Sequence, residues 1–327
     1  MIPNNRDNEE SVRHLISHCM EENRKKVLVI YDDSTLELLP VFRGQLRDSG
    51  KTVECVKLDT ARQHGEEPPE YVQKNMLFNE AVICITKYSI AHTKARKQTE
   101  EKGITFLSMP DYNMEILKNP AFTVDYKSIL PRVRRYAEFL SKGRQIEVTA
   151  KSGTHLFLSI EGRKGNCCPG LTNSQYLLGS PPDIEANVSP IEKLTYGVLV
   201  VDGSITDWRI GLLKEPVILY IESGVVKKIE SEDQETAKTV MKIFSEAGGT
   251  KASTVGEFGI GFNDRAKICG NMLIDEGAGG CIHFGMGSNW TIGGENRVDF
   301  HLDFVVKEAT VTVDGKEIIR EGRLIYG

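Results

Sequence analysis

The chain has 327 residues, of which 40% are hydrophobic and 27% are charged, and its formal net charge is -5. This length accommodates two domains that each bury a core. The acidic balance argues against a nucleic acid or an anionic membrane surface as a partner, since both favour basic proteins. No run approaches the roughly 18 apolar residues that a membrane-spanning helix needs, so we expect no membrane segment.

The cysteines and the N-terminal stretch indicate a cytoplasmic protein. The seven cysteines are odd in number, and several, such as Cys55, Cys84 and Cys281, lie in strand-like apolar segments. A disulfide framework usually has an even number of cysteines, placed in the loops of a small secreted domain. The first residues are polar and acidic and lack the apolar middle of a secretory signal. We therefore expect reduced thiols and a cytoplasmic location.

Residues 1–143 are predicted to form an N-terminal α/β domain, because short β-branched runs alternate with helical patterns. The predicted strands are 26–31, 52–58, 81–86 and 104–108, and the predicted helices are about 33–46, 70–78, 93–102 and 126–141. This alternation is typical of a doubly wound parallel sheet. Ligands of such sheets approach the carboxyl ends of the strands. Asp32 follows the first strand and His92 follows the third, so both are candidates there.

Residues 144–327 are predicted to form a C-terminal α+β domain that carries the catalytic metal site. Alternating β-formers around Ser152-Gly153 predict a hairpin over 146–162, and a loop rich in Gly, Pro and Asn follows over 162–182. Further strands are predicted at 196–201, 216–221, 225–230, 299–307 and 309–313, with one helix at about 233–247. The last 70 or so residues are dense in glycine.

The strongest local signal for chemistry is His301-Leu302-Asp303 inside the strand-like run VDFHLDFVV. Residues i and i+2 of a strand point to the same face, so the histidine and the aspartate are placed to chelate one cation. For this motif alone, a solvated edge-strand face remains the alternative interpretation.

Further acidic and imidazole groups upstream shift the balance towards a metal. Glu257 lies in VGEFGIGFN, Glu276 and His283 lie on either side of a glycine-rich turn in LIDEGAGGCIHFGMG, and Glu185 lies in DIEANVSP. Such groups are costly to bury in apolar sequence unless they are paired or bound to metal. Together with the His301–Asp303 pair they supply enough nitrogen and oxygen donors for two divalent ions.

The ordered segments 185–190, 257–263, 275–287 and 301–304 resemble the aminopeptidase T/S family of metallopeptidases, leucyl aminopeptidase-like enzymes. They also resemble the related iron-dependent dioxygenases that open dihydroxypyridine rings. The resemblance implies six metal ligands: Glu185, Glu257, Glu276, His283, His301 and Asp303. It also implies a homodimer. Two positions depart from the peptidases: Trp290 stands where they place a tyrosine, and His155 replaces an aspartate of their Gly-Thr-Asp strand.

Two mechanisms fit this set of ligands. In the hydrolytic one, one or two zinc, cobalt or manganese ions activate a water that cleaves an N-terminal peptide or related amide bond, and Glu257 or Glu276 accepts its proton. In the oxidative one, His283, His301 and Asp303 hold a single iron(II).

The sequence gives grounds for each mechanism. We expect Glu185, His92 and Trp290 to contact the peptide or small-molecule substrate. Retention of Glu257 and Glu276 favours the hydrolase, which is the interpretation we prefer from the sequence. The missing tyrosine favours the dioxygenase. A nucleotide-binding module is the non-enzymatic alternative, but the glycine-rich segments lack the Lys-Ser/Thr ending of a P-loop.

Overall fold

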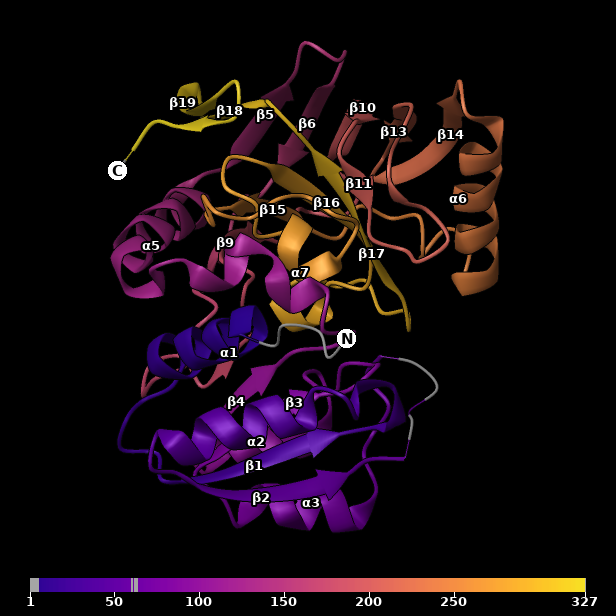
Figure 1. The fold of residues 1–327 in the computed structure, drawn as a ribbon. Helices are drawn as coiled ribbons and strands as arrows, with labels where there is room; N and C mark the ends of the chain where they lie inside the picture. The colour runs from indigo at the N-terminus through magenta and orange to yellow at the C-terminus, as the bar shows by residue number, and fades with distance from the viewer. Residues whose placement is uncertain (1–5, 60, 62–63, 327) are drawn as a thin grey trace. The chain divides into compact units, whose positions relative to one another are not determined.

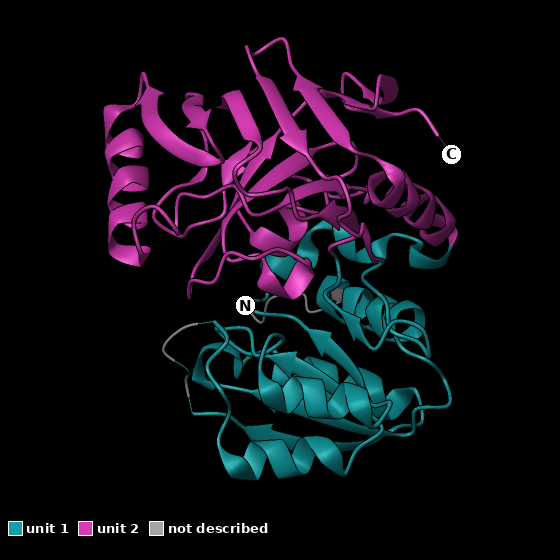
Figure 2. Ribbon diagram, turned by 180° about the vertical axis from the view of Figure 1, so that it is seen from behind, with its two compact units in different colours: residues 1–127, 169–182 teal, residues 128–168, 183–327 magenta. Residues whose placement is uncertain are grey.

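The computed structural model describes residues 6–59, 61 and 64–326. The chain divides into two compact units, which Figure 2 shows in different colours. Unit 1 comprises 1–127 and 169–182, and unit 2 comprises 128–168 and 183–327. The sequence placed a single boundary after residue 143. Unit 2 instead begins at residue 128, just inside the predicted helix 126–141, and the segment 169–182 belongs to unit 1. Within the described part, no helix is long and apolar enough to span a bilayer.

Unit 1 is built on a five-stranded parallel sheet with the order β2-β1-β3-β4-β8. Its strands are β1 (Lys26–Tyr31), β2 (Thr52–Lys57), β3 (Ala81–Ile85), β4 (Thr105–Ser108) and β8 (Leu178–Gly179). Its helices are α1 (Arg6–Cys19), α2 (Leu39–Asp48), α3 (Glu70–Leu77) and α4 (Lys94–Glu101), with 3-10 turns η1 (Asp33–Thr35), η2 (Ile116–Lys118) and η3 (Pro120–Thr123). Figure 1 shows α2 and α3 lying along the sheet, and both contact β1 and β2. The predicted α/β class is confirmed.

Two details of unit 1 differ from the sequence prediction. The helix expected from residue 33 starts only at Leu39, because Asp32 caps a single 3-10 turn instead. Its carboxylate accepts hydrogen bonds from the backbone N–H groups of Ser34 and Lys87. The last strand, β8, lies inside the segment predicted to be loop. It is two residues long, and its pairing with β4 is a long-range contact that no local pattern signals.

Unit 2 contains an eight-stranded and a seven-stranded sheet, both antiparallel. The first has the order β14-β13-β10-β6-β5-β18-β19-β20. Its strands are β5 (Gln145–Thr149), β6 (His155–Ser159), β10 (Thr195–Val201), β13 (Val217–Glu222), β14 (Val225–Ser231), β18 (Thr310–Val313), β19 (Lys316–Arg320) and β20 (Arg323–Leu324). The predicted hairpin forms β5 and β6. Helix α5 (Tyr126–Lys142) ends one residue later than expected, and α6 (Gln234–Ala247) contacts β14.

The seven-stranded sheet has the order β12-β11-β17-β16-β15-β9-β7. Its strands are β7 (Asn166–Cys168), β9 (Glu185–Val188), β11 (Ser204–Ile205), β12 (Gly211–Leu212), β15 (Phe258–Gly261), β16 (Ile282–Gly287) and β17 (His301–Val306). Two short helical elements accompany it, α7 (Met272–Asp275) and η4 (Trp290–Ile292). Figure 1 shows β15, β16 and β17 side by side. Four of the six predicted metal ligands lie on strands of this sheet.

Candidate metal centre

Strands β16 and β17 place both histidines and the aspartate on one face of the sheet. Alternate residues of a strand point to the same side, so His301 and Asp303 share a face of β17. Asp303 pairs across the strands with Gly285, which lies two residues after His283 on β16. Phe304, whose side chain points the other way, is fully buried in the apolar layer on the opposite face. The alternation that the sequence predicted therefore holds.

Two glutamates reach the same face from the neighbouring strands. Gly259 of β15 pairs with His283, so Glu257, two residues before Gly259, lies on the histidine face. Glu185 of β9 pairs with Gly261 of β15, which puts its side chain on this face too. Glu185 and Glu257 are only 6% and 7% exposed. Four adjacent strands thus converge on one buried polar cluster.

Glycines make room for the two imidazole rings. A Cβ atom built on Gly259 would lie 2.1 Å from the ring of His283, and one built on Gly285 would lie 2.5 Å from the ring of His301. Ordinary carbon–carbon contacts are about 3.5–4.0 Å. Each ring therefore lies directly across a glycine of the next strand, and a side chain at either position would displace it. At the cluster, the many glycines of this part of the sequence therefore leave space for the imidazole rings.

The donor atoms form two groups that share one glutamate. Glu185, Glu257 and His283 make up the first group, and Glu257, His301 and Asp303 the second; within each group the ligand atoms all lie within 4.8 Å of one another. Nε2 of His283 is 3.0 Å from Oε2 of Glu185. Nε2 of His301 is 3.0 Å from Oδ1 of Asp303 and 3.3 Å from Oε2 of Glu257.

Burial and mutual charge shift the ionisation of this cluster. Burial, reinforced by Glu185, raises the pKa of Glu257 to about 7. Burial opposes the charged form of His283, but contact with the Glu185 carboxylate outweighs it and raises the pKa of that imidazole to about 9. In the same way Asp303 raises the pKa of His301 against the effect of burial. The imidazoles thus partly compensate the carboxylates.

Two further carboxyl groups, those of Glu276 and Asp183, are buried beside the cluster. Burial and the nearby Asp303 raise the pKa of Glu276 well above its usual range. Burial, with Glu185 and Glu257, does the same to the pKa of Asp183. Five carboxyl groups therefore lie near two imidazoles, and burial favours the protonated form of three of them, Asp183, Glu257 and Glu276. A bound cation would instead favour their ionised forms.

The residues present fit a divalent metal ion. Within the described part of the chain, Nδ1 of His283 is a buried atom without a hydrogen-bond partner, whereas Nε2 of the same ring contacts Glu185. Nδ1 of His301 lies 3.1 Å from the carbonyl oxygen of Ser288 and donates its proton there. Nε2, which faces Glu257 and Asp303, is therefore the ring nitrogen left to bind a metal. First-row divalent metals bind imidazole nitrogens and carboxylate oxygens. A hydrogen bond to the other ring nitrogen fixes the tautomer of the imidazole that binds.

The structure brings together five of the six predicted ligands: Glu185, Glu257, His283, His301 and Asp303. Glu276 belongs to neither group; it follows α7 and acts on the cluster through Asp303. Its role as a metal ligand stays a prediction.

The two remaining predicted residues are Trp290 and His92. Trp290 lies on η4, half exposed, with the guanidinium carbon of Arg297 5.2 Å from the centre of its ring. His92 lies in unit 1 between β3 and α4, so its predicted contact with the substrate also stays a prediction.

Sequence reasoning missed two residues around Glu185. Asp183 is 5% exposed, and after burial and Asp303 it is a further cause of the raised pKa of Glu276. Asn187 donates a 2.6 Å hydrogen bond from its side chain to Oε1 of Glu185, which leaves Oε2 for other partners. Both lie two residues from Glu185 in DIEAN, so the strand alternation that was applied to His301 and Asp303 would have found them.

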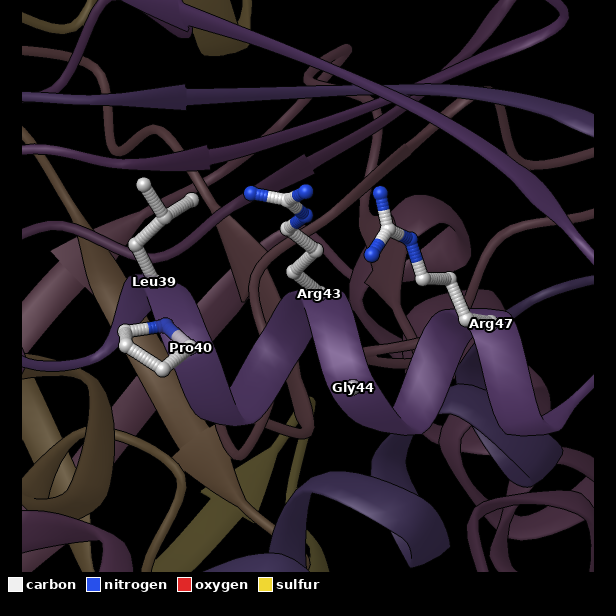
Figure 3. Close-up of a pocket in the computed structure, with 5 residues that line it drawn as sticks. All are labelled: Leu39, Pro40, Arg43, Gly44 and Arg47. Atoms are coloured by element: carbon white, nitrogen blue, oxygen red, sulfur yellow. The ribbon is translucent and has the colours of Figure 1, made fainter.

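A shallow cavity of about 300 Å³ lies along α2 in unit 1. It is lined by Leu39, Pro40, Arg43, Gly44 and Arg47, and Figure 3 shows the leucine and both arginine side chains projecting from the same side of the helix. None of the predicted ligands lines this cavity, so it is not the metal centre.

Comparisons with known proteins identify a family and two solved structures of similar fold. The family described as 2,5-dihydroxypyridine 5,6-dioxygenase (NicX) matches residues 41–326. The solved structure of 2,5-dihydroxypyridine dioxygenase from Pseudomonas putida KT2440 is 18% identical, with a TM-score of 0.81, and the match covers 98% of this chain and 97% of that one. Wild-type AmpT from Thermus thermophilus is 13% identical, with a TM-score of 0.68 and coverage of 98% and 100%. No curated protein matches the chain.

The fold is that of both solved structures, and the cluster could hold a divalent metal ion. The match over 41–326 includes every predicted ligand and most of both units. The chain belongs to the 2,5-dihydroxypyridine 5,6-dioxygenase family.

Proposed function

We propose that this enzyme is an iron(II)-dependent dioxygenase that opens a dihydroxylated pyridine or a closely related ring. The observation that carries the proposal is the family match, which spans all the side chains of the cluster. This reverses the preference for a hydrolase that the sequence alone suggested. That preference rested on the retention of Glu257 and Glu276, and of these two Glu276 belongs to neither group of donor atoms.

In this proposal His283 from the first group of donor atoms, with His301 and Asp303 from the second, would hold the metal as two imidazoles and one carboxylate. Such a set leaves positions open for other ligands. When bound, iron(II) supplies the redox chemistry that ring cleavage by dioxygen requires. The side chain of His301 is 35% exposed, whereas that of His283 is 2% exposed. The substrate therefore approaches from the side of His301.

The remaining groups of the cluster handle protons and orientation. Oε2 of Glu257 lies 3.3 Å from Nε2 of His301, so it is placed to accept the proton of a ring hydroxyl that binds next to this histidine. Glu185 contacts His283 and would meet the ring from the opposite end of the cluster. The exposed ring of Trp290 offers a flat surface on which an aromatic substrate can stack.

The second candidate is a metallo-aminopeptidase-like hydrolase with two zinc, cobalt or manganese ions. The observation in its favour is that Glu257 belongs to both groups of donor atoms, as a carboxylate that bridges two metals would. Against it stands Trp290, which has no hydroxyl to assist at the oxyanion.

Two assays on one anaerobically purified sample separate the candidates. We expect oxygen uptake with 2,5-dihydroxypyridine and iron(II), and no release of aniline from aminoacyl anilides. Anilide cleavage without oxygen uptake would overturn the proposal in favour of the hydrolase.

A further inference from the structure

The loop 288–296 connects β16 to the segment before β17 and carries two features of the site. Its first residue, Ser288, accepts the Nδ1 proton of His301 through its carbonyl oxygen. The same residue donates its backbone N–H to the carbonyl of Phe300, 2.8 Å away. The loop also carries Trp290. The orientation of the His301 ring, and so the direction in which Nε2 points, therefore depends on the position of this loop.

Asn289 holds the loop from inside. Its side chain is fully buried, and its amide nitrogen donates to Oγ of Ser189 at 2.8 Å and to Oε1 of Glu192 at 2.9 Å. Its amide oxygen accepts the backbone N–H of Asn296 at 2.8 Å. One side chain thus joins the start of the loop to its end and to the segment after β9. A Cβ on Gly294 would lie 2.1 Å from Cγ of Asn289, so the backbone closes tightly over this amide.

Glu192 and Arg163 hold the loop from outside. Oε1 of Glu192 also accepts the backbone N–H of Glu295 at 2.6 Å, and Oε2 pairs with Arg163 at 2.8 Å. The two side chains are only 16% and 14% exposed, so the ion pair is largely removed from solvent. Arg163 also donates a hydrogen bond to the carbonyl of Gly293. Hydrogen bonds from the Glu295 backbone and Asn289 lower the pKa of Glu192 despite its burial, which keeps this carboxylate ionised.

We propose that Asn289, held by Glu192, is a positioning residue of the metal centre. By fixing the loop 288–296 it places the Ser288 carbonyl, which selects the tautomer and the orientation of His301. This inference deepens the proposed function, because it assumes that the cluster binds a metal. Partners of a metal-bound histidine typically contribute about 10- to 100-fold to metal affinity, and Asn289 acts one contact further out, through the loop.

The test is Asn289→Asp, which keeps the size of the side chain but sets a carboxylate against Oε1 of Glu192. Asn79→Asp is the matched control, because Asn79 is 6% exposed and also donates its amide to a glutamate, Glu54, at 3.1 Å. It lies in unit 1 and takes no part in the cluster. Cobalt(II) is the probe, read by its visible absorption, and thermal unfolding of the metal-free chains is measured in parallel.

We expect Asn289→Asp to weaken cobalt(II) binding by about 10-fold or more and to change the cobalt spectrum. Asn79→Asp should change binding by less than about twofold, at a comparable loss of thermal stability. If Asn289→Asp does not fold, Glu192→Gln serves instead. It keeps the side-chain oxygen that Asn289 meets but removes the charge that pairs with Arg163, and we expect a smaller loss of affinity with an altered spectrum.

Cobalt affinity and spectrum equal to those of the unmutated chain in the folded variant would overturn the positioning role. If Asn289→Asp weakens cobalt(II) binding but the unmutated chain does not open the ring of 2,5-dihydroxypyridine, the positioning role holds and the proposed dioxygenase activity is wrong. An unmutated chain that binds no cobalt(II) would overturn both.

Discussion

Replacing Gly285 with alanine tests whether the imidazole rings need the space that a glycine on the neighbouring strand leaves. Gly285 is not among the glycines with positive φ, so its backbone conformation accepts alanine. The new Cβ would lie 2.5 Å from Cε1 and 2.7 Å from Nε2 of His301, and 2.9 Å from Cβ of Glu257. Since ordinary contacts start near 3.5 Å, the ring must retreat by about 1 Å.

That displacement is large on the scale of a metal bond. Ligand distances in metal sites vary by about 0.2 Å, so a shift of about 1 Å removes His301 from the first coordination sphere. We expect Gly285→Ala to weaken iron(II) or cobalt(II) binding by at least about 100-fold, more than loss of an outer partner does. Anaerobic competition titration against a chelator with a known affinity measures this loss.

Gly44→Ala is the control. No atom lies within 4 Å of a Cβ built on Gly44, which is inside α2 of unit 1. Alanine in a helix is about 1 kcal/mol more favourable than glycine, so this variant should keep its metal affinity and gain stability. If Gly285→Ala folds and binds metal as tightly as the Gly44→Ala control, the steric account of the cluster is wrong.

Three further predictions follow from the cluster. His301→Ala should lower the metal content sharply, whereas Cys167→Ala should not; metal analysis of purified proteins checks both, and equal losses would contradict the ligand assignment. The pKa of His283 is raised from 6.5 to about 9, so its contribution to stability is complete below pH 6.5 and is lost as pH rises through about 9. Denaturant unfolding of the metal-free chain should therefore show lower stability at pH 10 than at pH 6, and a rise would count against the proposed contacts. Trp290→Ala should raise KM for the aromatic substrate several-fold without changing metal content; an unchanged KM would exclude stacking on this ring.

The parts of the fold that local patterns determine could be predicted from the sequence. The run KVLVIY forms β1 with the predicted bounds, because a buried parallel strand is apolar on both faces. Asp233 accepts backbone hydrogen bonds from Glu235 and Thr236 at the start of α6, as an N-cap residue does. At the site, strand alternation predicts that His301 and Asp303 share one face, and they do.

The parts that depend on long-range pairing could not be predicted. Strands β7 and β8 have three and two residues, too few for periodicity to distinguish them from loop, and their partners β9 and β4 decide their conformation. The role of Asn289 also has no local signature, since its contacts with Ser189 and Glu192 span about 100 residues. Glu276 was placed among the ligands by its glycine-rich surroundings and by the resemblance, and neither determines where its side chain points.

X-ray absorption at the metal edge tests the central claim most directly, on chain loaded anaerobically with iron(II) and quantified. The account predicts about one iron per chain, two imidazole ligands, and no metal–metal scattering. Two metals per chain, with a metal–metal distance of about 3.5–4 Å as in dinuclear hydrolases, would contradict it.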